Sequence, residues 1–235
     1  MALDDIPEII LLCIENQHIS AFNEALANKW PSFLRRPKLG IRVVNGTLDE
    51  LAMPFQLIVS PANSYGRLDG GFDHVISHTF CRPHLDYDTL TNAAQAVLYE
   101  RWRGFAPPGT CTLAPFPEEL EGKNEWGCKW VALCPTMRIS SDVTWDREVV
   151  YECIWSLMCE LERFNRGRRE DRIGSILITP LATGVGGVSK ERWATQFVLA
   201  LKHYADSLQR PKRWSNLRWS LLERDAAAVR KTWKV

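Results

Sequence analysis

Two glycine-rich loops contain the residues whose types and spacing could support chemistry. The first, SPANSYGRLDGGFD (60–73), follows a short apolar run and precedes a helical pattern. The second, TPLATGVGGVSKE (179–191), also lies between a predicted strand and a predicted helix. Both exceed the roughly two to six residues that usually connect such elements. We therefore expect the additional backbone to wrap around a ligand, and a long turn is the alternative.

The second loop has the features of an anion site. Gly184, Gly186 and Gly187 allow backbone N–H groups to approach a bulky anion, and Ser189 is predicted to cap the following helix. Loop amides and a helix N-terminus together bind phosphate without lysine, arginine or metal. Neither GxxxxGK[ST] nor an early GxGxxG is present, which argues against a P-loop or a Rossmann-like site. Two such loops in one domain favour a diphosphate held from both sides.

The polar residues of the first loop allow two interpretations. Asp73 lies in the first turn of a predicted helix, where a carboxylate is favourable to the helix dipole whatever the function. Asn63 follows a strand end, where it could close an Asx turn or face a ligand.

The histidines that follow this loop are candidates for metal binding or proton transfer. His74 and His78 are four residues apart on one helix face, and Cys81 and His84 come next. Arg82-Pro83 between the last two and the absence of HExxH argue against zinc. GxSxG is absent as well, so we set aside a serine nucleophile.

Three ordered segments, VVNGTLDEL, LIVSPANS…LDGGFD and ITPLATGVGG, resemble those of the macrodomain family, an α/β module that binds ADP-ribose. The resemblance extends from about residue 41 to residue 208. It implies binding of ADP-ribose or an ADP-ribosylated substrate, with no cofactor. It also implies possible hydrolysis at the distal ribose, of the 1″-phosphate or of a mono-ADP-ribosyl ester. The alternative is a reader module without turnover.

The resemblance also assigns roles to individual residues. Asn63 would address the distal ribose, and Asp73 would orient or activate a water molecule. The other implied ligand-binding positions are Thr47, Asp49, Ser60, Ala62, Gly70, Gly71, Phe72, Thr183, Gly184, Val185, Gly186 and Gly187.

The sequence departs from the family pattern at several of these positions. Thr47 occupies the place of the aspartate that usually accepts a hydrogen bond from the adenine amino group, and Asp49 is the alternative acceptor. Ser60 replaces the first asparagine of NAAN. Gly186 replaces the aromatic residue of the late loop, for which Tyr65 or Phe72 could substitute.

Alternating strands and helices must position these loops. Continuous apolar runs predict strands, and apolar residues three and four apart predict helices. We expect strands at 7–15, 41–46, 55–61, 110–116, 129–136, 175–181 and 217–223, and helices at 20–30, 74–80, 88–102, 147–164 and 189–208.

This alternation favours one three-layer α/β/α sandwich with a mixed, mostly parallel sheet. We expect a single domain over 1–235, in which residues 1–40 add an N-terminal strand and helix at the sheet edge. Ser20 is the predicted N-cap of that helix.

Composition restricts the partners. A net charge of +1 gives no general reason to expect nucleic acid. Residues 202–235 contain nine Lys or Arg and three Asp or Glu, which fits either an anionic partner or a solvated helix face.

The expected location is intracellular, cytoplasmic or nuclear. Seven cysteines without CxxC indicate a reducing compartment. Asp4, Asp5 and Glu8 do not fit a signal peptide, and no apolar run approaches about 18 residues, so we expect no membrane partner.

Overall fold

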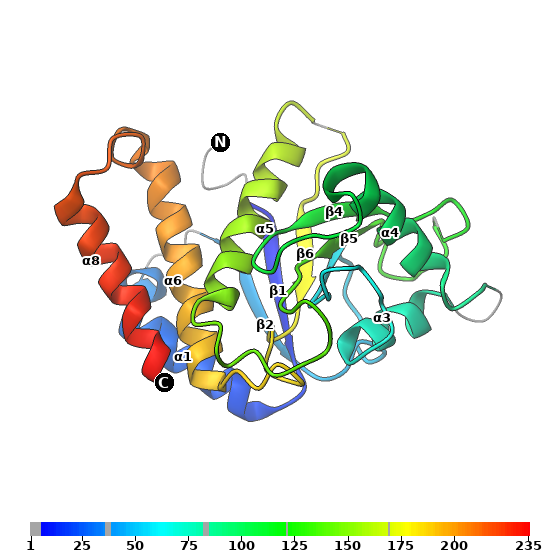
Figure 1. The fold of residues 1–235 in the computed structure, drawn as a ribbon, viewed down its shortest axis with the longest axis horizontal. Helices are drawn as coiled ribbons and strands as arrows, with labels where there is room; N and C mark the ends of the chain where they lie inside the picture. The colour runs from blue at the N-terminus through cyan, green and yellow to red at the C-terminus, as the bar shows by residue number, and fades with distance from the viewer. Residues whose placement is uncertain (1–5, 36–38, 82–84, 121, 169) are drawn as a thin grey trace.

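A six-stranded sheet lies at the centre of the computed structural model, which describes residues 6–35, 39–81, 85–120, 122–168 and 170–235 (Figure 1). The strand order is β2-β1-β6-β3-β5-β4, and all neighbours are parallel except β4 and β5. This confirms the predicted mixed, mostly parallel sheet. The strands are β1 (Glu8–Cys13), β2 (Ile41–Asn45), β3 (Leu57–Ser60), β4 (Thr112–Pro115), β5 (Trp130–Leu133) and β6 (Ser175–Ile178).

Helices cover both faces of the sheet. They are α1 (Asn16–Lys29), α2 (Pro31–Arg35), α3 (Phe72–Phe80), α4 (Thr89–Trp102), α5 (Val149–Asn165), α6 (Lys190–Gln209), α7 (Pro211–Trp214) and α8 (Trp219–Arg230), followed by the 3₁₀ turn η2 (Lys231–Lys234).

Two hydrophobic cores explain the layering. Side chains along a strand point alternately to opposite faces. Ile9 and Leu11 of β1 pack in one core with α1, α5 and α6, whereas Ile10 and Leu12 pack in the other with α3 and α4. Each strand therefore joins two apolar layers, which confirms the three-layer arrangement.

The N-terminal strand is not an edge element, contrary to our expectation. β1 pairs with β2 on one side and with β6 on the other, with Ile9 opposite both Ile41 and Ile176. The physical reason is burial. Five of the six residues of β1 are buried, which requires neighbours and helices on all sides, whereas β2 is half exposed and tolerates the edge.

The predicted strand at 217–223 is wrong, because residues 219–223 form the first turns of α8. Its more buried positions recur at helical spacing, at Leu221, Asp225 and Val229. Trp219 is 78% exposed, which a strand inside a covered sheet would not permit. α8 lies alongside α6 at one end of the molecule (Figure 1).

The two predicted helix caps had different outcomes. Ser189 is the N-cap of α6, as predicted, and its Oγ accepts a hydrogen bond from the Arg192 amide at 3.1 Å. Ser20 is not a cap, because α1 begins four residues earlier at Asn16. The Ser20 hydroxyl instead donates to the Asn16 carbonyl oxygen within the helix.

All seven cysteines are free thiols, and all except Cys159 are buried. Within the described ranges, no helix has both the length and the apolar character needed to cross a membrane. Asp4 and Asp5, on which the expectation about a signal peptide partly depends, lie outside the described residues.

Candidate functional site

A cavity of about 340 Å³ lies beyond the carboxyl ends of β1, β6, β3 and β5. Each strand leads into a segment that lines it, with Ile14 after β1, Asn63 after β3, Met137 after β5 and Gly184 after β6. This edge is where open α/β sheets bind ligands, because the strand-to-helix loops and helix N-termini converge there.

Most of the predicted site residues line this cavity. They come from both glycine-rich loops and are Asn63, Gly70, Gly71, Phe72, Asp73, Thr183, Gly184, Val185 and Gly186. Thr47, Asp49, Ser60, Ala62 and Gly187 are not among the lining residues. Ser60 and Ala62, at the start of the first loop, are completely buried.

The turn after β2 does not reach the cavity. The Thr47 amide and hydroxyl both donate to Glu50 Oε2, at 2.8 and 3.0 Å. Asp49 accepts a hydrogen bond from Thr79 Oγ1 at 3.3 Å. β2 lies one strand beyond β1, and neither Thr47 nor Asp49 lines the cavity.

Asp73 combines burial with access to the cavity. It lies in the first turn of α3, is only 4% exposed and accepts a hydrogen bond from Ser60 Oγ at 2.6 Å through Oδ1. Burial raises the pKa of its carboxyl to about 7, while the Ser60 hydrogen bond lowers it and the Asp69 carboxylate raises it. Ser60 thus supports the carboxyl from below and does not line the cavity.

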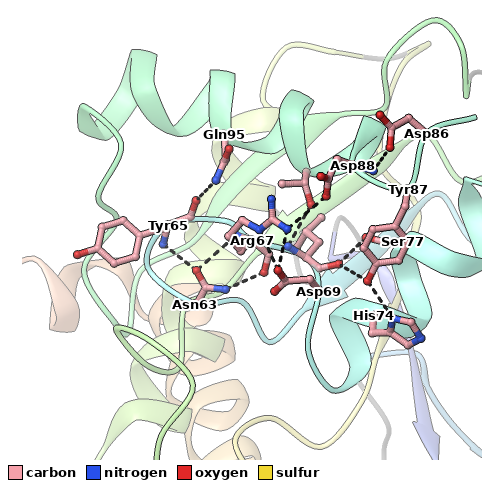
Figure 2. A network of polar contacts seen from close by, with 12 residues as sticks. Asn63, Tyr65, Arg67, Asp69, His74, Ser77, Asp86, Tyr87, Asp88 and Gln95 are labelled. Carbon is pink, nitrogen blue, oxygen red and sulfur yellow. Dashed lines mark hydrogen bonds and ion pairs between the residues drawn. The ribbon is translucent and has the colours of Figure 1, made fainter.

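Hydrogen bonds fix the first loop against α3 and α4 (Figure 2). The Asn63 amide nitrogen donates to the Arg67 carbonyl oxygen at 2.7 Å, and its Oδ1 accepts from the Tyr65 amide at 3.0 Å. This is the Asx-turn role that the sequence left open. Arg67 then forms ion pairs with Asp69 and Asp88, which close the far side of the loop.

The histidines of α3 are directed elsewhere. His74 Nδ1 lies 2.8 Å from Tyr87 Oη, and neither His74 nor His78 lines the cavity. In the part of the chain that the structure describes, no group of three or more His, Cys, Asp or Glu side chains could hold a metal ion. His84, a component of the zinc alternative, lies outside that part.

The late loop requires glycine at two positions, Gly186 and Gly187. Gly187 has a φ of +69°, and a Cβ there would lie 2.8 Å from Asp142 Oδ2. A Cβ on Gly186 would lie 2.6 Å from the Ala182 carbonyl oxygen and 3.0 Å from Val143 Cγ2. The Gly187 amide donates to the Gly184 carbonyl oxygen at 3.0 Å, which makes the loop a compact turn.

Glycine at two other positions has no such explanation. Gly70 and Gly184 do not have positive φ, and a Cβ at either would meet no atom within 4 Å. Other residues could therefore adopt the same backbone. The space beside them is empty, and both glycines line the cavity from opposite loops.

The late loop also presents unpaired donors. The amides of residues 183–186 donate no hydrogen bond to any described residue, and neither do those of Gly70 and Gly71. Unpaired amides of this kind, ahead of a helix N-terminus, bind anions. Among the described lining residues there is no lysine or arginine, and the carboxylates are Glu15, Asp69 and Asp73.

Sequence analysis missed the residues contributed by β1 and β5. Ile14, Glu15 and His18 follow β1, and Thr136, Met137 and Ser140 follow β5. The available signal was their position just after apolar runs. For β1, the prediction of an edge strand gives no reason to include the residues that follow it.

A second cavity, of about 430 Å³, lies between α2 and the helices α6, α7 and α8 of the basic C-terminal region. None of the predicted site residues lines it. Arg213 forms ion pairs with Asp206 and Asp225, so part of the basic charge is neutralised internally. An anionic partner for this region stays a prediction.

No family model and no curated protein matches this sequence. Among solved structures, the macrodomain of Mycobacterium tuberculosis DarG aligns with a TM-score of 0.50 and 17% identity, over 68% of this chain and 90% of that one. An Oceanobacillus iheyensis macrodomain mutant with ADPR aligns with a TM-score of 0.47 and 15% identity, over 66% and 74%. The alignment with the DarG macrodomain shows that the chain has the macrodomain fold.

Proposed function

We propose that this protein binds ADP-ribose or a derivative of it in the 340 Å³ cavity. The observation that carries the proposal is the pair of facing loops with unpaired amides, in which Gly70 and Gly184 leave space that the fold itself does not need. The macrodomain fold supports the same ligand class.

The diphosphate lies against residues 183–186 in this proposal. Their amides donate to no described residue and precede α6, whose N-terminus adds a partial positive charge. An anion held in this way needs no basic side chain, which fits a cavity without lysine or arginine among its described lining residues.

The distal ribose lies beside Gly70, Gly71 and Asp73, and we propose hydrolysis of a bond at that ribose. A carboxyl with a pKa of about 7 is half ionised near neutrality, so it can accept a proton from water at physiological pH. The oxygen of that water attacks the phosphorus or the acyl carbon, and the bond from that atom to the ribose oxygen breaks. The ribose oxygen takes up the proton held by Asp73 and leaves as a hydroxyl group. Candidate substrates are the 1″-phosphate and a mono-ADP-ribosyl ester.

A reader module without turnover is the second candidate. The observation in its favour is Asn63, whose amide is engaged in closing its own loop. An asparagine used in this way is less available to position a ribose for reaction. Binding through backbone amides would be unaffected.

Calorimetry with ADP-ribose tests the binding proposal, and turnover assays with the 1″-phosphate and with mono-ADP-ribosylated protein test hydrolysis. We expect saturable binding with one site per chain. A flat titration at millimolar ligand, with protein that melts cooperatively, would refute the proposal. Binding without turnover on either substrate would identify the reader.

A further inference from the structure

We infer that the adenine end of the ligand lies over the carboxyl end of β1, with its amino group read by Glu15. This inference rests on the proposed function. It concerns the part of the cavity that sequence analysis did not anticipate, formed by Ile14, Glu15 and His18.

The order of the strands defines the direction of the ligand. The consecutive parallel strands β1, β6 and β3 end at the same edge of the sheet, about 4.8 Å apart. The loop after β6 lies in the middle and supplies the unpaired amides. The loop after β3 leads to Asp73 on one side. If the diphosphate lies at the centre and the distal ribose lies toward Asp73, the adenine at the other end of the ligand lies toward β1.

The end of β1 has the shape and rigidity that a flat base requires. Ile14 is 69% exposed although it is apolar, and it lines the cavity. Its backbone is held, because Asn45 Nδ2 donates to the carbonyl oxygens of Cys13 at 2.9 Å and Ile14 at 3.0 Å. The His18 ring forms the floor of the cavity at this end, and its centroid lies 5.6 Å from that of the Trp193 ring in an edge contact. An apolar platform beside a ring edge suits an aromatic heterocycle.

Glu15 supplies the polar contact. It precedes α1 at the N-cap position, yet its side chain makes no capping hydrogen bond. Its Oε2 lies 3.9 Å from His18 Nδ1 and its side chain is 63% exposed, so the carboxylate is accessible from the cavity. A carboxylate accepts hydrogen bonds and does not donate them, and in an anion-binding cavity it repels a diphosphate. An exocyclic amino group at this end satisfies it.

The positions suggested by sequence cannot take this role. Thr47 is bonded to Glu50 and Asp49 to Thr79, both in the turn after β2, outside the cavity. Asp49 is therefore a suitable control, as an exposed acid whose removal should not affect the ligand.

The test compares two ligands by calorimetry on the full chain. They are ADP-ribose and its hypoxanthine analogue, in which an oxygen replaces the amino group. We expect the unmodified protein to prefer ADP-ribose by about tenfold, the scale of one hydrogen bond to a charged group. Glu15→Ala should bring the ratio of the two affinities close to one, whereas Asp49→Ala should leave it unchanged.

Ile14→Ala provides an independent arm. It should weaken both ligands by a similar factor of about three to ten, because a platform contributes to either base. The preference for ADP-ribose should remain. The melting temperature of each variant should be measured to confirm that it is folded.

Several results would overturn the inference. They are an unmodified protein that binds both ligands equally, a Glu15→Ala variant that keeps the preference, or an Asp49→Ala variant that loses it. With measurable binding, these outcomes leave the proposed function intact. If the unmodified protein binds neither ligand, the proposed function fails and this inference fails with it.

Discussion

Removing the Ser60 hydroxyl should raise the pKa of Asp73. Ser60 Oγ donates to Asp73 Oδ1 at 2.6 Å, and both residues are buried. A hydrogen bond to a charged group contributes about 1.5–3 kcal/mol, and 1.36 kcal/mol corresponds to one pKa unit. Because the bond stabilises the ionised carboxylate, Ser60→Ala should raise the pKa from about 7 by about one to two.

The assay is a carbon-13 NMR titration of the Asp73 carboxyl carbon, which reports ionisation whether or not the protein has turnover. Ser60→Thr keeps the hydroxyl and should largely restore the pKa. Ser77→Ala is the matched control, since Ser77 is also buried but its hydroxyl donates to the Leu68 carbonyl oxygen at 2.6 Å. It should lower stability without moving the Asp73 titration.

The reasoning is refuted if Ser60→Ala titrates like the unmodified protein while Ser60→Thr does the same. Such a result would mean that Ser60 does not stabilise the carboxylate and that burial alone sets its pKa. If turnover is present, its pH profile should move upward with the NMR value in Ser60→Ala, because the same ionisation limits the proton transfer.

Three further predictions follow from the geometry. Gly184→Glu should abolish ADP-ribose binding in calorimetry, because the new side chain fills the cavity. Its melting temperature should change little, because a Cβ at this position meets no atom within 4 Å. Gly186→Ala should instead lower the melting temperature, because its Cβ would lie 2.6 Å from the Ala182 carbonyl oxygen. Burial raises the folded-state pKa of Asp73 above its ordinary 3.8, so the folded state retains a proton that the unfolded state loses, and stability falls as pH rises from about 4 to 7. Melting curves should therefore show that the free energy of unfolding of Asp73→Asn rises relative to that of the unmodified protein across this pH range, by about 2–4 kcal/mol at pH 7. Any turnover should drop about 10²-fold. The same pH dependence of stability in both proteins would contradict this prediction. The Arg192 guanidinium donates to the carbonyl oxygens of Trp233 and Val235. Arg192→Ala should therefore make residues 231–235 more accessible to limited proteolysis and lower the free energy of unfolding by about 1 kcal/mol. Unchanged cleavage would argue against this prediction.

The segment at 217–223 shows why local pattern can mislead. LRWSLLE contains enough large apolar residues to suggest a strand, but Trp219 and Leu222 are exposed in α8. Which of these side chains is buried depends on the partner surface of α6, and sequence spacing over seven residues does not distinguish the two periods.

The need to bury apolar residues made it possible to predict the three layers and the position of the two loops from the sequence alone. The apolar run of β1 had to be covered on both faces, and glycine-rich connections between strands and helices had to lie at the carboxyl edge of the sheet. The tertiary structure alone decided which strands are neighbours, because hydrogen bonds between strands do not depend on side-chain identity. By placing β1 beside β6, it brought Glu15 into the cavity and left Thr47 outside. It also decided the direction of the Ser60 hydroxyl, since its partner Asp73 is brought within 2.6 Å only when α3 packs against β3.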